Sequence, residues 1–280
     1  MFLRPDSLLE ALDVLANSNA TILAGGTDLF PAFTGSQLQG PVLDISAIVE
    51  LKGIRITSDA VEIGGRCTWS EILTAPLPRG FDGLRAAARE IGSIQIQNTA
   101  TVAGNICNAS PAADGVAALL ALDAAVTLTS RSGSRTLPLS NFIHGNRKTA
   151  RQPHEILTAI RVPRCWDAAA SSFLKLGARR YLVISIVMVA GNLVISPDGR
   201  IQRAAICVGS CSPKAIRLTE LESSLVGRTA DSSLTEILRS NLFSELSPID
   251  DVRATAVYRQ EAAQTLVRRT LELCVSKGPQ

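Results

Sequence analysis

Two glycine-centred segments constrain this chain more than any other feature. The first is Ala24-Gly25-Gly26-Thr27-Asp28-Leu29, directly after the apolar pair Ile22-Leu23. The second is Thr99-Ala100-Thr101-Val102-Ala103-Gly104-Asn105, which leads into Ala109-Ser110-Pro111-Ala112-Ala113-Asp114. Glycine lets the main chain turn with positive φ and approach a ligand closely. Adjacent N–H groups, Thr hydroxyls and Asn amides can then donate to phosphate oxygens, so the pair predicts a cradle for a phosphorylated ligand.

The first segment is not the G-x-G-x-x-G dinucleotide fingerprint, and no acidic residue follows it at the expected distance on a second parallel strand. A dinucleotide bound here would therefore place its pyrophosphate between two loops and not on one helix N-terminus. Taken alone, Gly25-Gly26 is equally compatible with a simple tight turn. The presence and order of both segments favour the ligand interpretation.

Composition narrows the class of protein. The chain has 280 residues, of which 46% are hydrophobic and 19% charged, and this length favours two domains over one. The formal net charge of +3 comes from scattered residues, which argues against nucleic-acid binding. No leader pattern begins the sequence, and the longest apolar stretch, 181–194, is too short to span a membrane. We expect a soluble, cytoplasmic protein.

Cysteine and histidine provide no reactive centre. The six cysteines do not form a disulfide framework, and only Cys207 and Cys211 are close in sequence. Their spacing in an apolar strand end favours packing over metal binding. His144 and His154 lie in loop-like sequence and are interpreted as surface residues. We therefore expect neither a metal site nor a catalytic side chain in this chain.

The first part of the chain mixes helix and strand patterns. Apolar residues at helical spacing predict an amphipathic helix over 5–17, capped by Asp6 or Ser7. The remaining expected helices are 69–73, 81–91 and 111–122. The expected strands are 21–24, 42–45, 53–56, 61–63, the hairpin 124–129 with 135–139, and 156–162.

The pattern changes after 163–171, which we interpret as a link between domains. Strands are expected at 173–176, 184–195 and 201–208, as a β-meander, followed by helices at 213–225, 234–242 and 255–274. The class is α+β. We expect a two-lobed domain over 1–166, with subdomains of about 1–55 and 56–166, and a smaller domain over 167–280 containing the antiparallel meander and helices.

The ordered motifs AGGTDL, TATVAGN and ASPAAD, followed by Asn146-Arg147-Lys148-Thr149, Glu155-Ile156-Leu157 and Leu174-Lys175-Leu176-Gly177-Ala178-Arg179-Arg180, resemble a known family. This is the FAD-binding (medium) subunit of the molybdenum hydroxylases, of the xanthine dehydrogenase and carbon monoxide dehydrogenase type. The resemblance runs from Pro5 to about Cys274. It implies a flavoprotein that carries no molybdenum or iron–sulfur site of its own.

The resemblance also implies roles for individual residues. The stretch Leu23, Ala24, Gly25, Gly26, Thr27, Asp28 and Leu29 would wrap the FAD pyrophosphate, chiefly through main-chain N–H groups of residues 25–27. From the other side, the site would be closed by Ala100, Thr101, Gly104 and Asn105, with the Asn105 amide as a side-chain partner.

Five further residues would contact the rest of FAD. The resemblance places Cys107 and Asn108 along the ribityl and adenosine parts, and Leu157 against the cofactor. Asp114 would accept hydrogen bonds from the adenosine ribose, and Lys175 would lie near the pyrimidine edge of the isoalloxazine. On the residues alone, Asp114 is also compatible with a charge that offsets a helix dipole, and Lys175 with a solvated strand residue.

The implied function is electron transfer within a hetero-oligomer. A large partner would hold the molybdopterin centre, a small partner would hold [2Fe–2S] clusters, and this chain would pass electrons through FAD to a terminal acceptor. The apolar stretch Tyr181-Leu182-Val183-Ile184 replaces the acidic loop of xanthine dehydrogenase-like members. NAD, a quinone, a protein carrier and oxygen therefore stay open as acceptors. Two alternatives are a self-contained FAD-dependent oxidase or reductase and a cofactor-free assembly protein.

Overall fold

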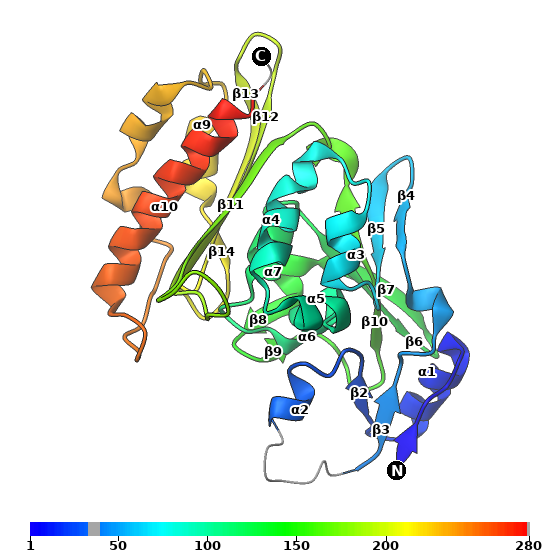
Figure 1. Ribbon diagram of the computed structural model, residues 1–280. Coiled ribbons are helices and arrows are strands. Elements are labelled where there is room, and N and C mark those ends of the chain that lie inside the picture. Colours follow the sequence, from blue (N-terminus) through cyan, green and yellow to red (C-terminus); the bar gives the residue numbers. More distant parts are fainter. Residues whose placement is uncertain (33–39, 279–280) are drawn as a thin grey trace.

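The computed structural model describes residues 1–32 and 40–278 and combines helices with mainly antiparallel sheets (Figure 1). The described residues form a three-stranded, a five-stranded, a four-stranded and a two-stranded sheet. The α+β class is confirmed. Among the described residues, no helix has both the length and the apolar character needed to cross a membrane.

The N-terminal sheet places the first glycine segment. Its parallel strands are β1 (Phe2–Leu3), β3 (Val42–Asp44) and β2 (Thr21–Leu23), in that order. Helix α1 (Leu8–Asn17) begins after Ser7, whose hydroxyl accepts a hydrogen bond from the Glu10 N–H. Its apolar stripe packs into a small core of its own with Leu43 and Ile48. The short helix α2 (Leu29–Ala32) then follows directly on the glycine loop.

The five-stranded sheet packs beside the helices that contain the second glycine segment. Its order is β4 (Ile54–Ile56), β5 (Ala60–Gly64), β10 (Ile156–Pro163), β6 (Ala125–Ser130) and β7 (Gly133–Pro138), and all neighbours are antiparallel. A short 3-10 turn (Val49–Leu51) precedes it. The helices of this region are α3 (Trp69–Thr74), α4 (Asp82–Glu90), α5 (Ile94–Thr99), α6 (Val102–Asn108), α7 (Asp114–Leu120) and α8 (Leu139–Phe142), beside the small pair β8 (Ile143–Gly145) and β9 (Lys148–Thr149).

The C-terminal part is the expected meander. Strands β11 (Ala170–Leu176), β12 (Val187–Ile195), β13 (Ile201–Gly209) and β14 (Ile216–Arg217) pair antiparallel in chain order, and helices α9 (Thr219–Leu225) and α10 (Ala256–Ser276) follow. Figure 1 shows α10 on one side of this sheet and α4 and α7 on the other. Because side chains alternate along a strand, Met188 packs into the larger core while Val187 and Val189 pack beneath α10. The sheet is therefore buried on both faces.

Three sequence expectations about elements are wrong. The second glycine segment, expected to be a loop, lies in α5 and α6, which begin after the capping residues Ser93 and Thr101 and are separated only by a short break. The helix expected from Pro213 begins at Thr219, because Ile216 and Arg217 extend the sheet. The helix expected over 234–242 is a pair of 3-10 turns, Ser232–Ile237 and Ser240–Phe243, separated by an extended Arg239.

Candidate functional site

The first glycine segment forms a tight turn with free donors. Gly26 has φ of +70°, in the left-handed region that favours glycine. In the described part of the chain, no acceptor receives a hydrogen bond from the N–H groups of Gly25, Gly26 or Thr27. Three consecutive free N–H groups around a left-handed residue are suited to bind an anion.

The two glycine segments touch each other through their main chains. A Cβ added to Gly25 would lie 2.0 Å from the Thr99 carbonyl oxygen and 3.0 Å from the Ala100 Cα. Only a residue without a side chain allows this approach. The free N–H groups of the first segment therefore lie beside the start of α6.

The second segment is helical, which corrects the expectation of two loops. Thr101 caps α6, and its Oγ1 accepts a hydrogen bond of 2.9 Å from the Gly104 N–H. Gly104 therefore has no N–H to give to a ligand. A Cβ there would meet only Thr101 Oγ1, at 2.8 Å, so its other surroundings are open. Thr101 and Gly104 can therefore contribute the Thr101 hydroxyl hydrogen and a surface without a side chain at Gly104.

Asn105 carries an unpaired amide oxygen. Its Oδ1 is buried and has no hydrogen-bond partner among the described residues. The same oxygen lies 3.1 Å from the position that a Cβ would take on Gly115, at the start of α7. A buried acceptor without a partner costs about 1–3 kcal/mol. Asn105 therefore joins the glycine segments to α7 and has unused hydrogen-bonding capacity.

Asp114 and Lys175 form a buried ion pair. Lys175 Nζ lies 2.6 Å from Asp114 Oδ2, and both side chains are less than a tenth exposed. The Ser185 hydroxyl donates to Asp114 Oδ1 at 2.5 Å, and Nζ also donates to the Glu90 carbonyl at 3.3 Å. Burial raises the pKa of Asp114 above its ordinary value, although Lys175 and Ser185 oppose the rise.

The adenosine ribose role of Asp114 and the isoalloxazine role of Lys175 stay predictions. The contact between the two side chains, at 2.6 Å, was not expected from the sequence. Its sequence separation of 61 residues explains why the contact was not foreseen.

The remaining predicted residues lie around this centre. Leu23 is buried at the end of β2, Ala24 is half-buried, Asp28 is exposed, and Leu29 begins α2. Cys107 lies in α6, where burial raises the pKa of its thiol to about 11. Asn108 accepts a hydrogen bond from Arg147 at 3.1 Å. Leu157 is only 4% exposed within the larger core.

Sequence reasoning missed Ser185 as a partner of the ion pair. The only signal was a hydroxyl within an otherwise apolar run. The loop just before it, between β11 and β12, exposes the apolar side chains of Tyr181, Leu182 and Ile184. The Arg180 guanidinium lies 5.4 Å from the centre of the Tyr181 ring.

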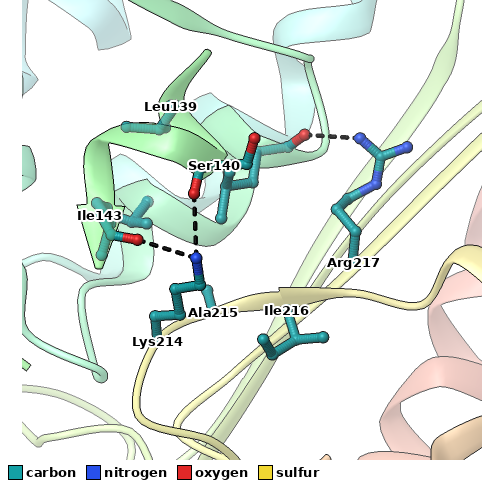
Figure 2. A pocket seen from close by; sticks show the side chains of 9 residues that line it. Leu139, Ser140, Ile143, Lys214, Ala215, Ile216 and Arg217 are labelled. Atoms are coloured by element: carbon teal, nitrogen blue, oxygen red, sulfur yellow. Dashed lines mark hydrogen bonds between the residues drawn. The ribbon is translucent and has the colours of Figure 1, made fainter. Parts of the chain in front are cut away.

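A separate cavity of about 200 Å³ lies between α7, α8 and the segment 214–217 (Figure 2). Figure 2 shows Lys214 Nζ directed at the carbonyl oxygens of Ser140 and Ile143, at 3.1 and 3.0 Å. The walls of the cavity are mainly apolar, and none of the predicted site residues lines the cavity. This cavity is therefore distinct from the candidate site.

Comparison with known families identifies the chain. Residues 1–165 match the family model described as the FAD binding domain in molybdopterin dehydrogenase. The chain belongs to this family. Residues 172–273 of this molybdopterin dehydrogenase flavoprotein match the carbon monoxide dehydrogenase flavoprotein C-terminal domain. Its cofactor is FAD, and it is an oxidoreductase component of the molybdenum hydroxylase type.

Similar proteins cover nearly the whole flavoprotein. The glyceraldehyde dehydrogenase medium chain of Sulfolobus acidocaldarius is 31% identical over 97% of this chain and 96% of its own length. The nicotinate dehydrogenase FAD-subunit of Eubacterium barkeri is 30% identical over 96% of this chain and 93% of its own length. A chain in the structure of reconstituted CO dehydrogenase from Oligotropha carboxidovorans superposes with a TM-score of 0.92 at 28% identity. The superposition covers 99% of this chain and 98% of that chain.

The residues of the candidate site fit FAD. Free N–H groups at 25–27 and the Thr101 hydroxyl are donors that a pyrophosphate needs. The unpaired Asn105 oxygen and the paired Asp114 and Lys175 add an acceptor and a cation.

Proposed function

We propose that this chain is the electron-transfer flavoprotein subunit of a hetero-oligomeric molybdenum hydroxylase. FAD, when bound, supplies one- and two-electron redox chemistry. The protein binds and orients the cofactor and sets the charge around it. The main-chain contact of Gly25 with Thr99 and Ala100 supports this proposal most strongly, because it brings both glycine segments to one place.

In this proposal the pyrophosphate is bound from two sides. The N–H groups of Gly25, Gly26 and Thr27 donate from the first segment, and the Thr101 hydroxyl donates from the second. The Asn105 amide contacts the adjoining part of the cofactor, since it lies between α6 and Gly115. Leu23, Ala24, Asp28, Leu29, Ala100 and Gly104 shape these two segments; Cys107, Asn108 and Leu157 stay predicted cofactor neighbours.

In this proposal Lys175 is a cation beside the redox-active ring. Lys175 has three N–H donors, and the protein uses two of them, on Asp114 and on the Glu90 carbonyl. The third can donate to the cofactor. Asp114 offsets most of the lysine charge, so the pair stabilises added negative charge on the ring moderately.

The proposed partners are a molybdopterin-containing large subunit and a [2Fe–2S] small subunit. Support comes from relatives that are named medium chains or FAD-subunits of dehydrogenases, including a carbon monoxide dehydrogenase. The terminal acceptor is NAD, a quinone, a protein carrier or oxygen. The exposed apolar side chains of Tyr181, Leu182 and Ile184 favour an acceptor other than NAD.

FAD titration of the purified chain tests the binding site. We expect Asn105→Ala to weaken FAD binding about tenfold, which corresponds to one lost hydrogen bond of about 1.4 kcal/mol. Asn241→Ala is the matched control, because Asn241 is exposed on a distant 3-10 turn. A wild-type chain that binds no FAD would overturn the proposal.

Affinity purification from the native cells tests the assembly. Molybdenum and iron should elute with the chain in a fixed ratio to FAD. Elution of the flavoprotein without either metal would contradict the proposed partners. This result would not contradict the proposed FAD site.

A further inference from the structure

A buried arginine in the last helix lies at the end of the C-terminal sheet. Arg259, near the start of α10, is only 3% exposed. Its Nη1 donates to the carbonyl oxygens of Ile186 at 2.6 Å and Ser210 at 3.0 Å, and its Nη2 donates to Asp251 Oδ1 at 2.7 Å. A buried guanidinium is costly unless its donors are paired. The Nη1 and Nη2 donors are paired and join the ends of two strands, whereas Nε has no partner among the described residues.

Both carbonyl groups belong to segments that lead to Asp114. Ile186 follows Ser185, whose hydroxyl donates to Asp114 Oδ1 at 2.5 Å. Ser210 donates its N–H to the Pro111 carbonyl at 3.0 Å, three residues before Asp114. The two routes from one side chain therefore converge on the same carboxylate.

Ser210 also has an unusual backbone. Its φ of +63° is in the left-handed region, which costs a residue with a Cβ roughly 1–2 kcal/mol. Such a conformation persists where surrounding contacts enforce it. The bonds from Arg259 to its carbonyl and from its N–H to Pro111 are contacts of this kind.

We propose that Arg259 is a positioning residue for the flavin site: through Ile186 and Ser210 it fixes Ser185 and the turn before Asp114, and so holds Asp114 against Lys175. This inference rests on the proposed function for its effect on FAD. A lysine cannot replace the arginine, because a single ammonium lacks the planar fork that reaches two carbonyls and a carboxylate together.

The consequence for FAD follows from charge. When Ser185 is displaced, Asp114 loses the hydrogen bond that holds it against Lys175, and a carboxylate that has moved away neutralises the Lys175 charge less effectively. Lys175 then attracts negative charge on the cofactor more strongly, so the midpoint potential of bound FAD rises. Ser185→Ala removes the same hydrogen bond directly and should raise the potential in the same way.

The experiment compares Arg259→Lys, Ser185→Ala and the double variant in the full chain. We expect each single variant to bind FAD about tenfold more weakly, with a raised potential. The double variant should be no weaker than Arg259→Lys alone, because the loss of Arg259 already releases Ser185. Additive losses, or an unchanged affinity and potential in Arg259→Lys, would overturn the proposal.

Hydrogen exchange without FAD supplies a second readout. In Arg259→Lys, amide exchange should accelerate at Ser210 and around residues 112–115. Cys274→Ala is the matched control, because Cys274 is buried at the far end of the same helix and away from Asp114. Acceleration of equal size in both variants would mean general destabilisation and would overturn the positioning role. A wild-type chain without FAD affinity would refute the proposed function, whereas this exchange comparison would still decide the positioning.

Discussion

At the scale of single residues, Gly25 gives the sharpest steric test. A Cβ at this position would overlap the Thr99 carbonyl oxygen, which is backbone and cannot move without shifting the end of α5. We expect Gly25→Ala to destabilise the chain by about 1–3 kcal/mol and to abolish measurable FAD binding. Denaturant unfolding and FAD titration would measure both effects.

Gly145→Ala is the control for this substitution, because nothing lies within 4 Å of a Cβ there. Its stability should stay within about 0.5 kcal/mol of the wild type. If Gly25→Ala behaved like Gly145→Ala in both measurements, the close approach of the two segments would be wrong.

The buried ion pair of Asp114 and Lys175 predicts how the free energy of unfolding changes in single and double variants. Asp114→Asn leaves the Lys175 ammonium buried without its counter-charge, so we expect a loss of about 3 kcal/mol in the free energy of unfolding. Adding Lys175→Met should restore part of that loss. A double variant less stable than Asp114→Asn would show that the lysine is stabilised by something other than Asp114.

The sequence allowed prediction of the glycine segments and Asn105 because their chemistry is local. The pairing of Asp114 with Lys175 was not predictable, since it depends on how the C-terminal sheet lies against α4 and α7. Ser185 was missed for the same reason: an apolar run gives no sign that one hydroxyl faces a carboxylate.

At the scale of elements, the hairpin of β6 and β7 is tied to the start of β10 by Arg135 and Glu155. Arg135 Nε and Nη2 donate to the two carboxylate oxygens at 2.6 and 2.9 Å, and Glu155 is buried. These hydrogen bonds, chiefly from Arg135, lower the pKa of Glu155 from 4.5. The carboxylate therefore stabilises the fold fully above about pH 4.5.

The stabilisation should fade as the pH falls below 4.5, because the unfolded chain takes up a proton before the folded chain does. We expect Glu155→Gln to lose about 1.5 kcal/mol at pH 7, and the difference from wild type to shrink towards pH 3. Urea unfolding at several pH values would measure this. A difference that stays constant with pH would exclude a role for the Glu155 charge.

Helix α6 shows why the second glycine segment was expected to be a loop. Thr, Gly and Asn all have low helix propensity, and tertiary packing overrode it. The Thr101 cap and the burial of Val102 and Ile106 hold the helix in place. The longer periodic patterns, such as α1, α4 and α10, were predicted well because packing and propensity agree there.

At the scale of the whole molecule, the C-terminal sheet belongs to two cores. Met188, Ala190 and Cys207 face α4 and α7, whereas their neighbours along the strands face α10. The alternation was not readable from the sequence, because both faces are apolar. The domain boundary near residue 167 accordingly stays a prediction.

This arrangement predicts the behaviour of the isolated segment 167–280. Without residues 1–166, an apolar face of the sheet becomes exposed, so we expect aggregation or fast amide exchange throughout β12. Light scattering and hydrogen exchange would measure this against the full chain. A monomeric segment with native-like protection in β12 would show that the C-terminal part folds alone.

In the proposed complex, FAD binds where the two glycine segments meet. Glycine-selective ¹⁵N labelling of the full chain, followed by NMR during an FAD titration, would show whether it does. We expect the amide signals of Gly25, Gly26 and Gly104 to shift and to saturate at one FAD per chain, while those of Gly133, Gly199 and Gly227 stay in place. Saturated binding that leaves Gly25 and Gly26 unshifted would contradict this binding site.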